Sequence, residues 1–343
     1  MGFAFLWLSI VFTTKLPKGM ILDNLAEIQR IASAIRTNVA RVIVGKENVV
    51  DLLVTALFCE GHVLLEDVPG SGKTTLARTL ARSLGCTFQR IQFTPDLLPS
   101  DISGVSIFNQ KSNQFEYRPG PIMAQVVLAD EINRAGPRTQ SALLEAMEER
   151  QVTVDGETRP LPYPFLVLAT QNPVELEGTF PLPEAQVDRF LMRLRMGYPE
   201  LEEERLILRR FRTTNPLTSI EPVASTEEIR TANQACREVF VHPVLEEYLL
   251  NIVRASRNHP SIALGISPRG SLALYRTSQA LAAIRNRTYV VPDDIKQLAP
   301  PVLAHRIIPS VETRLHERPV EDVLKELLEK AVVPVEENWG DQR

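Results

Sequence analysis

A glycine-rich run at residues 67–75, Asp-Val-Pro-Gly-Ser-Gly-Lys-Thr-Thr, carries residue types that bind phosphate groups. It follows an apolar run at residues 63–65 and precedes a helix-like run at residues 76–84. A strand, a glycine-rich loop and a helix in this order bind an anion, because loop N–H groups and the positive end of the helix dipole face it. We therefore expect Lys73 to contact the β- and γ-phosphates of a nucleotide and the Thr74 hydroxyl to bind Mg²⁺.

The loop departs at one position from the phosphate-binding pattern G-x-x-x-x-G-K-[ST]. Asp67 stands where the pattern has its first glycine, whereas Gly70 and Gly72 are present to let the backbone turn tightly. The alternative, a chance glycine-rich turn before a helix, leaves the preceding strand unexplained. The residues expected to bind the nucleotide here are consecutive: Pro69, Gly70, Ser71, Gly72, Lys73, Thr74 and Thr75.

Two carboxylates, Asp130 and Glu131, end a second informative stretch. The apolar residues 126–129 run directly into them, as in parallel strands that are buried on both faces. At a strand end beside Thr74, Asp130 can hold Mg²⁺ directly or through water. Glu131 is placed to orient or deprotonate an attacking water. The alternative of two solvated acids in a loop does not account for the apolar run.

Three further polar residues are candidates for the same chemistry. Asn172 follows the apolar run at residues 165–169 and can hydrogen-bond a γ-phosphate or the water, although an Asn-Pro pair is usually only a turn. Most arginines are ordinary surface residues, and this alternative stays open for Arg189. Arg269 begins a predicted helix, where a positive charge opposes the helix dipole, and this unfavourable position hints at a separate role.

Strands and helices alternate up to Pro199, which predicts a doubly wound α/β domain with a parallel sheet. Ligands of such sheets bind at the carboxyl ends of the strands, and Lys73, Asp130, Glu131 and Asn172 all follow strands. Beyond Pro199 we expect no strands. We expect an α/β core at 20–199, which contains a two-stranded insertion at 93–120 and a hairpin at 151–163. An all-helical C-terminal domain should follow at 200–343, with helices near 201–213, 226–240, 244–258, 268–286, 293–305 and 320–331.

Composition limits the classes of protein. The 343 residues suggest about two domains, and 44% hydrophobic content is enough for real cores. The formal charge of −4 gives no reason to expect a nucleic-acid partner. The three cysteines, Cys59, Cys86 and Cys236, are widely spaced and indicate buried thiols of a reducing compartment rather than disulfides or a zinc site.

The first nineteen residues contain a strongly apolar run at residues 3–12. Ten residues are fewer than the ~20 that a membrane-spanning helix needs. A signal peptide is disfavoured because Lys15 and Lys18 follow the apolar run instead of preceding it. We therefore expect no integral span. Translation from Met20 is the favoured interpretation, and a peripheral membrane anchor in residues 1–19 is the alternative.

Taken together, these motifs resemble the MoxR family of AAA+ ATPases over about residues 42–308. The most specific stretches are residues 65–70 and the run LADEINRAGPRTQSALLEAM at residues 128–147. Shorter matches are Asn172, Leu-Pro-Glu-Ala-Gln at 182–186, Asp-Arg-Phe at 188–190 and Ser-Pro-Arg at 267–269. In this family the first glycine of the loop is often replaced. A minor departure is Gly136, where the family has proline.

The resemblance implies a role for each matching residue. It makes Lys73 and Thr74 the Walker A pair, and Asp130 and Glu131 the Walker B pair. Asn172 becomes sensor 1. The remaining implied roles are adenine contacts for Val44 and Gly45, the arginine finger for Arg189, sensor 2 for Arg269, the helix-2 insertion for 93–120 and the hairpin before sensor 1 for 151–163.

The resemblance also implies an activity and partners. These are Mg²⁺-dependent hydrolysis of ATP, assembly into ring hexamers and a chaperone-like role in maturing other proteins, often ones with von Willebrand factor A domains. It further implies a bacterial or archaeal protein of the cytoplasm. Two alternatives stay open: a nucleic-acid motor, which salt-dependent DNA binding with stimulated ATPase would favour, and a nucleotide-gated scaffold that barely hydrolyses ATP.

Overall fold

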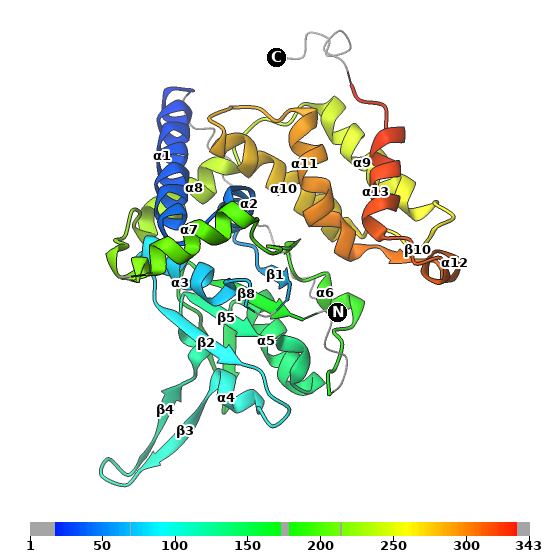
Figure 1. Cartoon of the computed structure of the whole chain (residues 1–343). Helices are drawn as coiled ribbons and strands as arrows, with labels where there is room; N and C mark the ends of the chain where they lie inside the picture. Colours follow the sequence, from blue (N-terminus) through cyan, green and yellow to red (C-terminus); the bar gives the residue numbers. More distant parts are fainter. Residues whose placement is uncertain (1–17, 69, 173–177, 213–214, 335–343) are drawn as a thin grey trace, which may run out of the picture.

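A five-stranded parallel sheet lies at the centre of the molecule (Figure 1). The structure, a computed structural model, describes residues 18–68, 70–172, 178–212 and 215–334. The order of strands across the sheet is β2-β5-β8-β1-β9, and every neighbouring pair is parallel. This order confirms the predicted doubly wound α/β fold. The strands are β1 Val63–Glu66, β2 Phe88–Gln92, β5 Val126–Asp130, β8 Leu166–Gln171 and β9 Met192–Leu194.

Helices cover both faces of the sheet because its strands are apolar on both sides. Every residue of β5 is buried, as its unbroken apolar run predicted. Val63 and Leu65 belong to the apolar cluster of α1, α2 and α3, whereas Leu64 between them belongs to the cluster of α4 and α5. These helices are α1 Lys18–Val42, α2 Glu47–Phe58, α3 Lys73–Ser83, α4 Pro99–Ser103 and α5 Pro137–Glu149.

Two antiparallel hairpins extend from the sheet, within the insertions predicted from the sequence. They consist of β3 Gly104–Asn109 with β4 Gln114–Pro119, and of β6 Gln151–Val154 with β7 Glu157–Pro160. The first projects farthest from the body (Figure 1). The hairpins touch, since the guanidinium of Arg159 lies 4.2 Å from the ring centre of Tyr117. The two hairpins therefore project together from the body of the molecule.

The second half of the described chain is mainly helical, but the expectation that strands stop after Pro199 is wrong. Ile262–Leu264 (β10) pairs antiparallel with Ile308–Pro309 (β11). Both strands are too short to leave a readable period in the sequence. The helices here are α7 Leu201–Phe211, α8 Thr226–Cys236, α9 Pro243–Arg257, α10 Pro268–Ile284, α11 Pro292–Leu303, α12 Val311–Leu315 and α13 Val320–Lys330; α12 was not expected.

Short helices join these elements. They are α6 Glu184–Val187 and the 3₁₀ turns η1 Pro121–Met123, η2 Ile132–Arg134, η3 Pro216–Ser219 and η4 Ala304–Arg306. Two of them matter below, because α6 leads into Arg189 and η4 contains Arg306.

One apolar core joins the helical half to the sheet. A single cluster of buried side chains runs from α1, α2 and α3 through the sheet to α8, α10 and α11. The helices after Pro199, which we call the lid, therefore pack directly on the N-terminal helices, as α8 and α10 do on α1. The exact division into a core of residues 20–199 and a lid of 200–343 stays a prediction. Residues 1–17, which contain the apolar run at residues 3–12, lie outside the described residues.

Within the described ranges, no helix combines the length and the apolar character needed to cross a membrane.

Candidate functional site

A polar cavity of about 400 Å³ opens at the carboxyl ends of β1, β5 and β8. The structure brings together there the candidate residues that the sequence places at strand ends. Four of them, Lys73, Asp130, Glu131 and Asn172, come from three different strand ends. The other predicted residues in its wall are Gly70, Gly72, Thr74 and Thr75, while Pro69 lies outside the described residues. We call this space the phosphate cavity.

The loop at the mouth of this cavity has the backbone that phosphate binding requires. Gly70 and Gly72 have φ values of 82° and 90°, in the left-handed region that favours glycine. Lys73 is the first residue of α3, so the positive end of the helix dipole faces the cavity. Its ammonium donates to the carbonyls of Asp67 (3.1 Å) and Val68 (2.7 Å). Burial lowers the pKa of Lys73, and the carboxylates of the site oppose this shift.

Asp67, which stands where the loop pattern has glycine, accepts backbone hydrogen bonds through its carboxylate. One carboxylate oxygen accepts the N–H of Val68 at 2.8 Å. The other accepts the N–H groups of Met196 (3.0 Å) and Gly197 (2.9 Å). The carboxylate therefore ties the start of the loop to the chain that leaves β9. Glycine at this position has no side chain to make that link.

The two acids after β5 are held by side chains of the neighbouring strands. The Thr170 hydroxyl donates to Asp130 at 2.6 Å and accepts the backbone N–H of Glu131 at 2.8 Å. Arg90 donates to the other oxygen of Asp130 at 2.9 Å, and the Gln92 amide donates to Glu131 at 2.7 Å. Glu131 has a φ of 57°, which is rare for a residue with a side chain. Such strain is typical of functional positions, where the surroundings impose it.

Sequence reasoning did not find Arg90, Gln92 and Thr170. The parallel register places Gln92 opposite Asp130, and Arg90 lies two residues earlier on the same face of β2. The available signal was polar residues at the carboxyl ends of the predicted strands, on the mixed strand β2 and at the end of the apolar run of β8. Single polar residues of this kind are common at strand ends, so only the pairing of strands distinguishes them.

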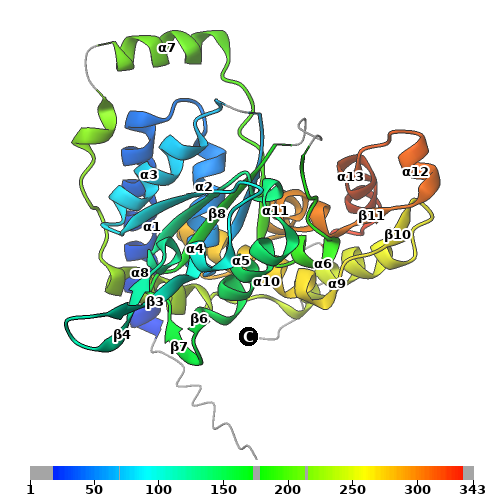
Figure 2. The same cartoon turned by 90° about the horizontal axis from the view of Figure 1, so that it is seen from below.

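A second cavity of about 590 Å³ adjoins the first and is lined mainly by apolar side chains. Gly70, Gly72 and Thr75 belong to the walls of both cavities, so the loop lies between them. One side is formed by α7, which passes along the side of the core where α1 and α3 lie (Figure 2). Its apolar wall is made by Val42, Ile43, Val44, Met196, Tyr198, Pro199, Ile207, Leu208 and Phe211.

The two predicted adenine contacts differ in their surroundings. Val44 lies in the wall of the apolar cavity. Gly45 instead faces α7, because a Cβ at this position would lie 1.6 Å from Oε1 of Glu203. Its φ of 67° also favours glycine. Gly45 thus allows the close approach of Glu203, and the contribution of α7 to this wall was not expected from the sequence.

Arg189 and Arg269 meet at the opposite edge of the sheet. Arg189 precedes the first residue of β9, whereas the loop with Lys73 follows the last residue of the parallel neighbour β1. Nε of Arg189 lies 3.0 Å from the carboxylate of Glu148, and Arg269 pairs with the other oxygen of that carboxylate. Within the described part of the chain, neither arginine lines the phosphate cavity. We call Glu148, Arg189 and Arg269 the arginine edge.

A cavity of about 290 Å³ at the arginine edge carries an excess of positive charge. Its charged wall residues are Arg150, Arg189, Arg269, Arg276, Arg306, Glu60, Glu148 and Asp188. Five guanidinium groups face three carboxylates, which suits this edge to an additional anion. Glu148 was not singled out by the sequence, because a carboxylate near the end of an exposed helix face has no distinguishing pattern.

Comparisons with known proteins agree with this geometry. Residues 62–192 match the family described as ATPase family associated with various cellular activities (AAA), and residues 254–327 match the AAA lid domain. The uncharacterized protein YeaC of Bacillus subtilis is 53% identical, over 87% of this chain and 93% of the relative. Chaperone MoxR1 of Mycobacterium tuberculosis is 43% identical, over 93% of this chain and 86% of the relative.

A solved structure is similar along nearly the whole chain. The crystal structure of a protein from Cytophaga hutchinsonii, described as a candidate ATPase, is 38% identical with a TM-score of 0.87. The match covers 92% of this chain and 99% of that protein. With these relatives, the parallel sheet and the phosphate cavity at its carboxyl edge, the chain belongs to the MoxR family of AAA+ ATPases.

Proposed function

We propose that this protein hydrolyses ATP to ADP and phosphate with Mg²⁺. The observation that carries the proposal is one cavity in which Lys73, Thr74, Asp130 and Glu131 face the same space. The adjoining cavity has mainly apolar walls of the kind that accept a purine ring. The loop between the two cavities is where the phosphate chain of ATP would lie.

The side chains of the cavity fit a magnesium ion. Mg²⁺ prefers oxygen ligands, and the Thr74 hydroxyl and the Asp130 carboxylate supply them. A bound Mg²⁺ would neutralise charge on the β- and γ-phosphate oxygens. Thr170 holds the Asp130 carboxylate in place through a hydrogen bond of 2.6 Å.

The other polar groups of the phosphate cavity have separate roles in hydrolysis. Lys73 binds phosphate oxygens, and Glu131 orients or deprotonates the attacking water. The Gln92 amide fixes the Glu131 carboxylate at 2.7 Å, which limits the directions in which that carboxylate can accept a proton. Asn172 contacts the γ-phosphate or the water from the end of β8. The preorganised charges lower the barrier because they need not reorganise during the reaction.

The protein assembles into a ring in which each subunit supplies residues that complete the ATP site of the next subunit. Arg189 and Arg269 lie a strand length away from the phosphate cavity of their own subunit, at an edge with excess positive charge. A neighbouring subunit that docks its phosphate cavity there would receive both guanidinium groups. An arginine supplied in this way is worth about 10³–10⁵ in rate. The family resemblance favours six subunits.

Mixing inactive subunits tests this arrangement. Arg189→Ala subunits retain the Walker B acids, and Glu131→Gln subunits retain the arginine, so each is nearly inactive alone. Mixed rings contain junctions where an intact Glu131 faces an intact Arg189, and ATPase activity should partly return. Subunit exchange is verified first by energy transfer between labelled subunits. Full activity of Arg189→Ala alone, or no recovery despite exchange, would contradict the arginine's role between subunits.

The energy of hydrolysis serves the remodelling of a client protein. Two observations support a chaperone-like role: the relative named Chaperone MoxR1, and the exposed aromatic pair of the β3–β4 hairpin. The rings of Phe108 and Phe115 lie 5.3 Å apart, and Phe115 is 74% exposed. Exposed apolar groups on a projecting hairpin are suited to protein contact. The expected client or adaptor carries a von Willebrand factor A domain.

The client can be captured with the slowly hydrolysing Glu131→Gln variant, purified with ATP from its native host. The matched control is Glu131→Gln combined with Phe108→Ser and Phe115→Ser, which removes the aromatic pair and leaves the phosphate cavity intact. The proposal expects a von Willebrand factor A protein with the first variant and its loss with the second. Equal capture by both variants would show that the hairpin is not the contact.

A further inference from the structure

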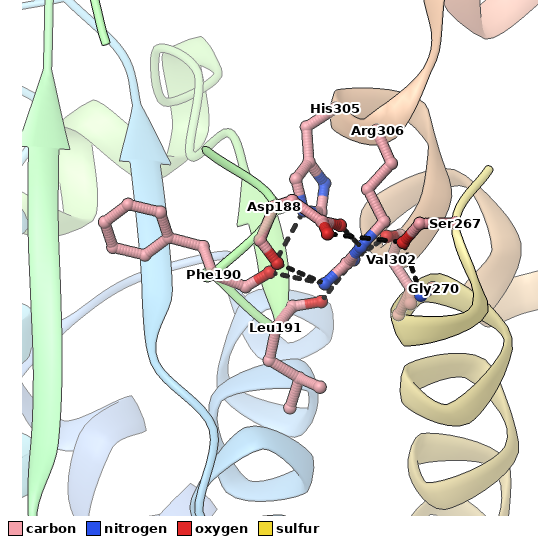
Figure 3. A network of polar contacts seen from close by, with 8 residues as sticks. All are labelled: Asp188, Phe190, Leu191, Ser267, Gly270, Val302, His305 and Arg306. Atoms are coloured by element: carbon pink, nitrogen blue, oxygen red, sulfur yellow. Dashed lines mark hydrogen bonds and ion pairs between the residues drawn. The ribbon is translucent and has the colours of Figure 1, made fainter. Parts of the chain in front are cut away.

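One nearly buried guanidinium of the lid holds the turn that carries Arg189 (Figure 3). The side chain of Arg306, in η4, is only 2% exposed. Its Nε donates to the Asp188 carboxylate at 2.7 Å. Its terminal nitrogens donate to the backbone carbonyls of Asp188 (3.2 Å), Phe190 (2.8 Å) and Leu191 (3.2 Å). Arg306 therefore contacts the residues on both sides of Arg189.

Two more lid residues hold the same turn. The Ser267 hydroxyl donates to the second carboxylate oxygen of Asp188 at 3.2 Å and caps the first turn of α10. The His305 ring lies 3.1 Å from the carbonyl of Phe190, and its Nε2–H donates to it. Because Arg269 is the second residue of α10, two residues after Ser267, one joint fixes the starting points of both arginines.

The lid is shaped to admit the Arg306 side chain. A Cβ on Gly270 would lie 3.0 Å from Cδ of Arg306, so glycine leaves the space that the side chain fills. Burial lowers the pKa of Arg306, and the Asp188 carboxylate opposes this shift. A buried guanidinium is tolerated only where its donors are matched, and here acceptors surround its planar fork.

The core fixes the turn from its other side. The Phe190 ring is fully buried among the residues that pack under α5, and the Leu191 N–H donates to the His62 carbonyl at 2.8 Å. The Arg189 side chain is the part left reachable, at 32% exposure, and it meets Arg269 on Glu148. The backbone of Arg189 is thus held by the lid and the core together, while its guanidinium points to the arginine edge.

We propose that Arg306 is a positioning residue for ATP hydrolysis in the neighbouring subunit: acting through Asp188, it holds Arg189 and Arg269 in one fixed arrangement. The inference rests on the proposed role of Arg189 between subunits. Arg306 itself touches no phosphate, because its donors are occupied by the turn at residues 188–191. A displacement of about 1 Å at a catalytic group can cost 10²-fold in rate.

Asp188→Asn and Arg306→Lys test the joint in the full-length protein. Asp188→Asn keeps the shape and removes the charge, and Arg306→Lys keeps the charge and removes the planar fork. Both should lower kcat by about 10²-fold while leaving the KM for ATP unchanged, since the phosphate cavity of the same subunit is untouched. Two variants are used so that a failure of one to fold does not remove the test.

Asp294→Asn is the matched control. Asp294 is a fully buried lid carboxylate that pairs with Arg285 (2.9 Å) and Arg287 (2.6 Å), away from the turn. Its loss should lower the melting temperature as much as Asp188→Asn does, with kcat close to wild type. A fall in kcat as large as that of Asp188→Asn would mean that general loss of lid stability explains both variants, which overturns the proposal.

Complementation separates a positioning role from a defect in the subunit's own site. Asp188→Asn subunits should regain activity when mixed with Glu131→Gln subunits, and should regain none with Arg189→Ala subunits, because both then lack a working arginine. Recovery with Arg189→Ala subunits would overturn the positioning role of Arg306 and leave the proposed intersubunit function standing. Failure of the Glu131→Gln and Arg189→Ala mixture, despite proven exchange, would overturn the proposed intersubunit function and this inference with it.

Discussion

The two edges of the central sheet, at the carboxyl ends and at the amino ends of its strands, are built in different ways. The carboxyl edge takes its chemistry from compact stretches, residues 67–75 and 130–131, and each follows directly from a buried strand. The arginine edge draws Glu148, Arg189 and Arg269 from three separate segments, and a fourth, with Arg306, holds them. The first edge surrounds the phosphate cavity, whereas the second surrounds a smaller cavity with an excess of positive charge.

The difference shows why hydrolysis can depend on assembly. A phosphate cavity formed by local turns is present as soon as one subunit folds. The arginines on the other edge are preorganised by contacts between lid and core, and in the proposed ring they would meet the phosphates of a neighbouring subunit. The following predictions test this division, from the largest expected effect to the smallest.

Lys73→Ala should abolish ATP binding even in subunits too dilute to assemble. The ammonium already lies at the loop mouth, 2.7 Å from the Val68 carbonyl, and is the cation placed to meet the β- and γ-phosphates. Isothermal titration calorimetry measures the affinity. Lys111→Ala, on the tip of the β3–β4 hairpin, is the control and should bind ATP as wild type does. Unchanged affinity in Lys73→Ala would remove the loop from the site.

Arg269→Ala should reduce kcat of the assembled protein by about 10²–10³-fold, the usual cost of removing one donor to transition-state charge. ATP affinity of dispersed subunits should not change, because Arg269 pairs with Glu148 at the other edge. Comparing affinity below the assembly concentration with kcat above it separates the two effects. Weaker ATP binding by dispersed subunits would show that Arg269 acts within its own subunit, and the contrast between the edges would fail.

Asp67→Ala should weaken ATP binding by about tenfold with little change in kcat. It leaves the N–H groups of Met196 and Gly197 without their carboxylate partner, and a hydrogen bond to a charged group contributes about 1.5–3 kcal/mol. The loop then loses its tie to the chain that lines the apolar cavity. Asp101→Ala, which removes the exposed carboxylate that accepts the Leu98 N–H, is the matched control. Equal affinities in both variants would assign Asp67 no part in nucleotide binding.

Mild acid should weaken the arginine edge gradually. Burial lowers the pKa of His62 to about 3 and holds that of His305 well below its usual value. Below pH ~6.5 the unfolded chain therefore binds protons that the native state does not. The free energy of unfolding should fall as the pH drops from 6.5 towards 3, by up to about 1.4 kcal/mol per pH unit for each histidine.

Urea denaturation at pH 7 and pH 5.5 measures this loss. His62→Gln should flatten the dependence on pH, whereas the exposed His316→Gln should leave it as in wild type. The His305 ring and the backbone carbonyl of His62 contact the turn at residues 190–191, so hydrogen-exchange protection factors, corrected for the intrinsic exchange rate at each pH, should fall there at pH 5.5 before ATP binding is lost. Parallel curves for wild type and His62→Gln would show that another group governs the acid sensitivity.

Much of the fold and of the phosphate cavity could be predicted, because both depend on short-range rules. Unbroken apolar runs such as residues 126–129 predicted buried parallel strands, and the polar residues directly after them predicted ligands at the carboxyl edge. The loop around Lys73 could be recognised because its glycines, lysine and threonine must be contiguous to surround a phosphate. These features can be read from the sequence because each depends only on residues that are neighbours along the chain.

Tertiary structure alone decided the rest. No sequence pattern predicted that the Asp67 carboxylate accepts hydrogen bonds from Met196 and Gly197. Nor did a pattern predict that Gly45 makes room for Glu203, or that β10 pairs with β11. Each depends on segments that the chain brings together from far apart. The joint around Arg306 is the strongest case, because Arg306 follows Asp188 by 118 positions in the sequence. A buried polar contact of this kind is specified by the packing of lid on core, and a single arginine in the sequence carries no sign of the acceptors it will meet.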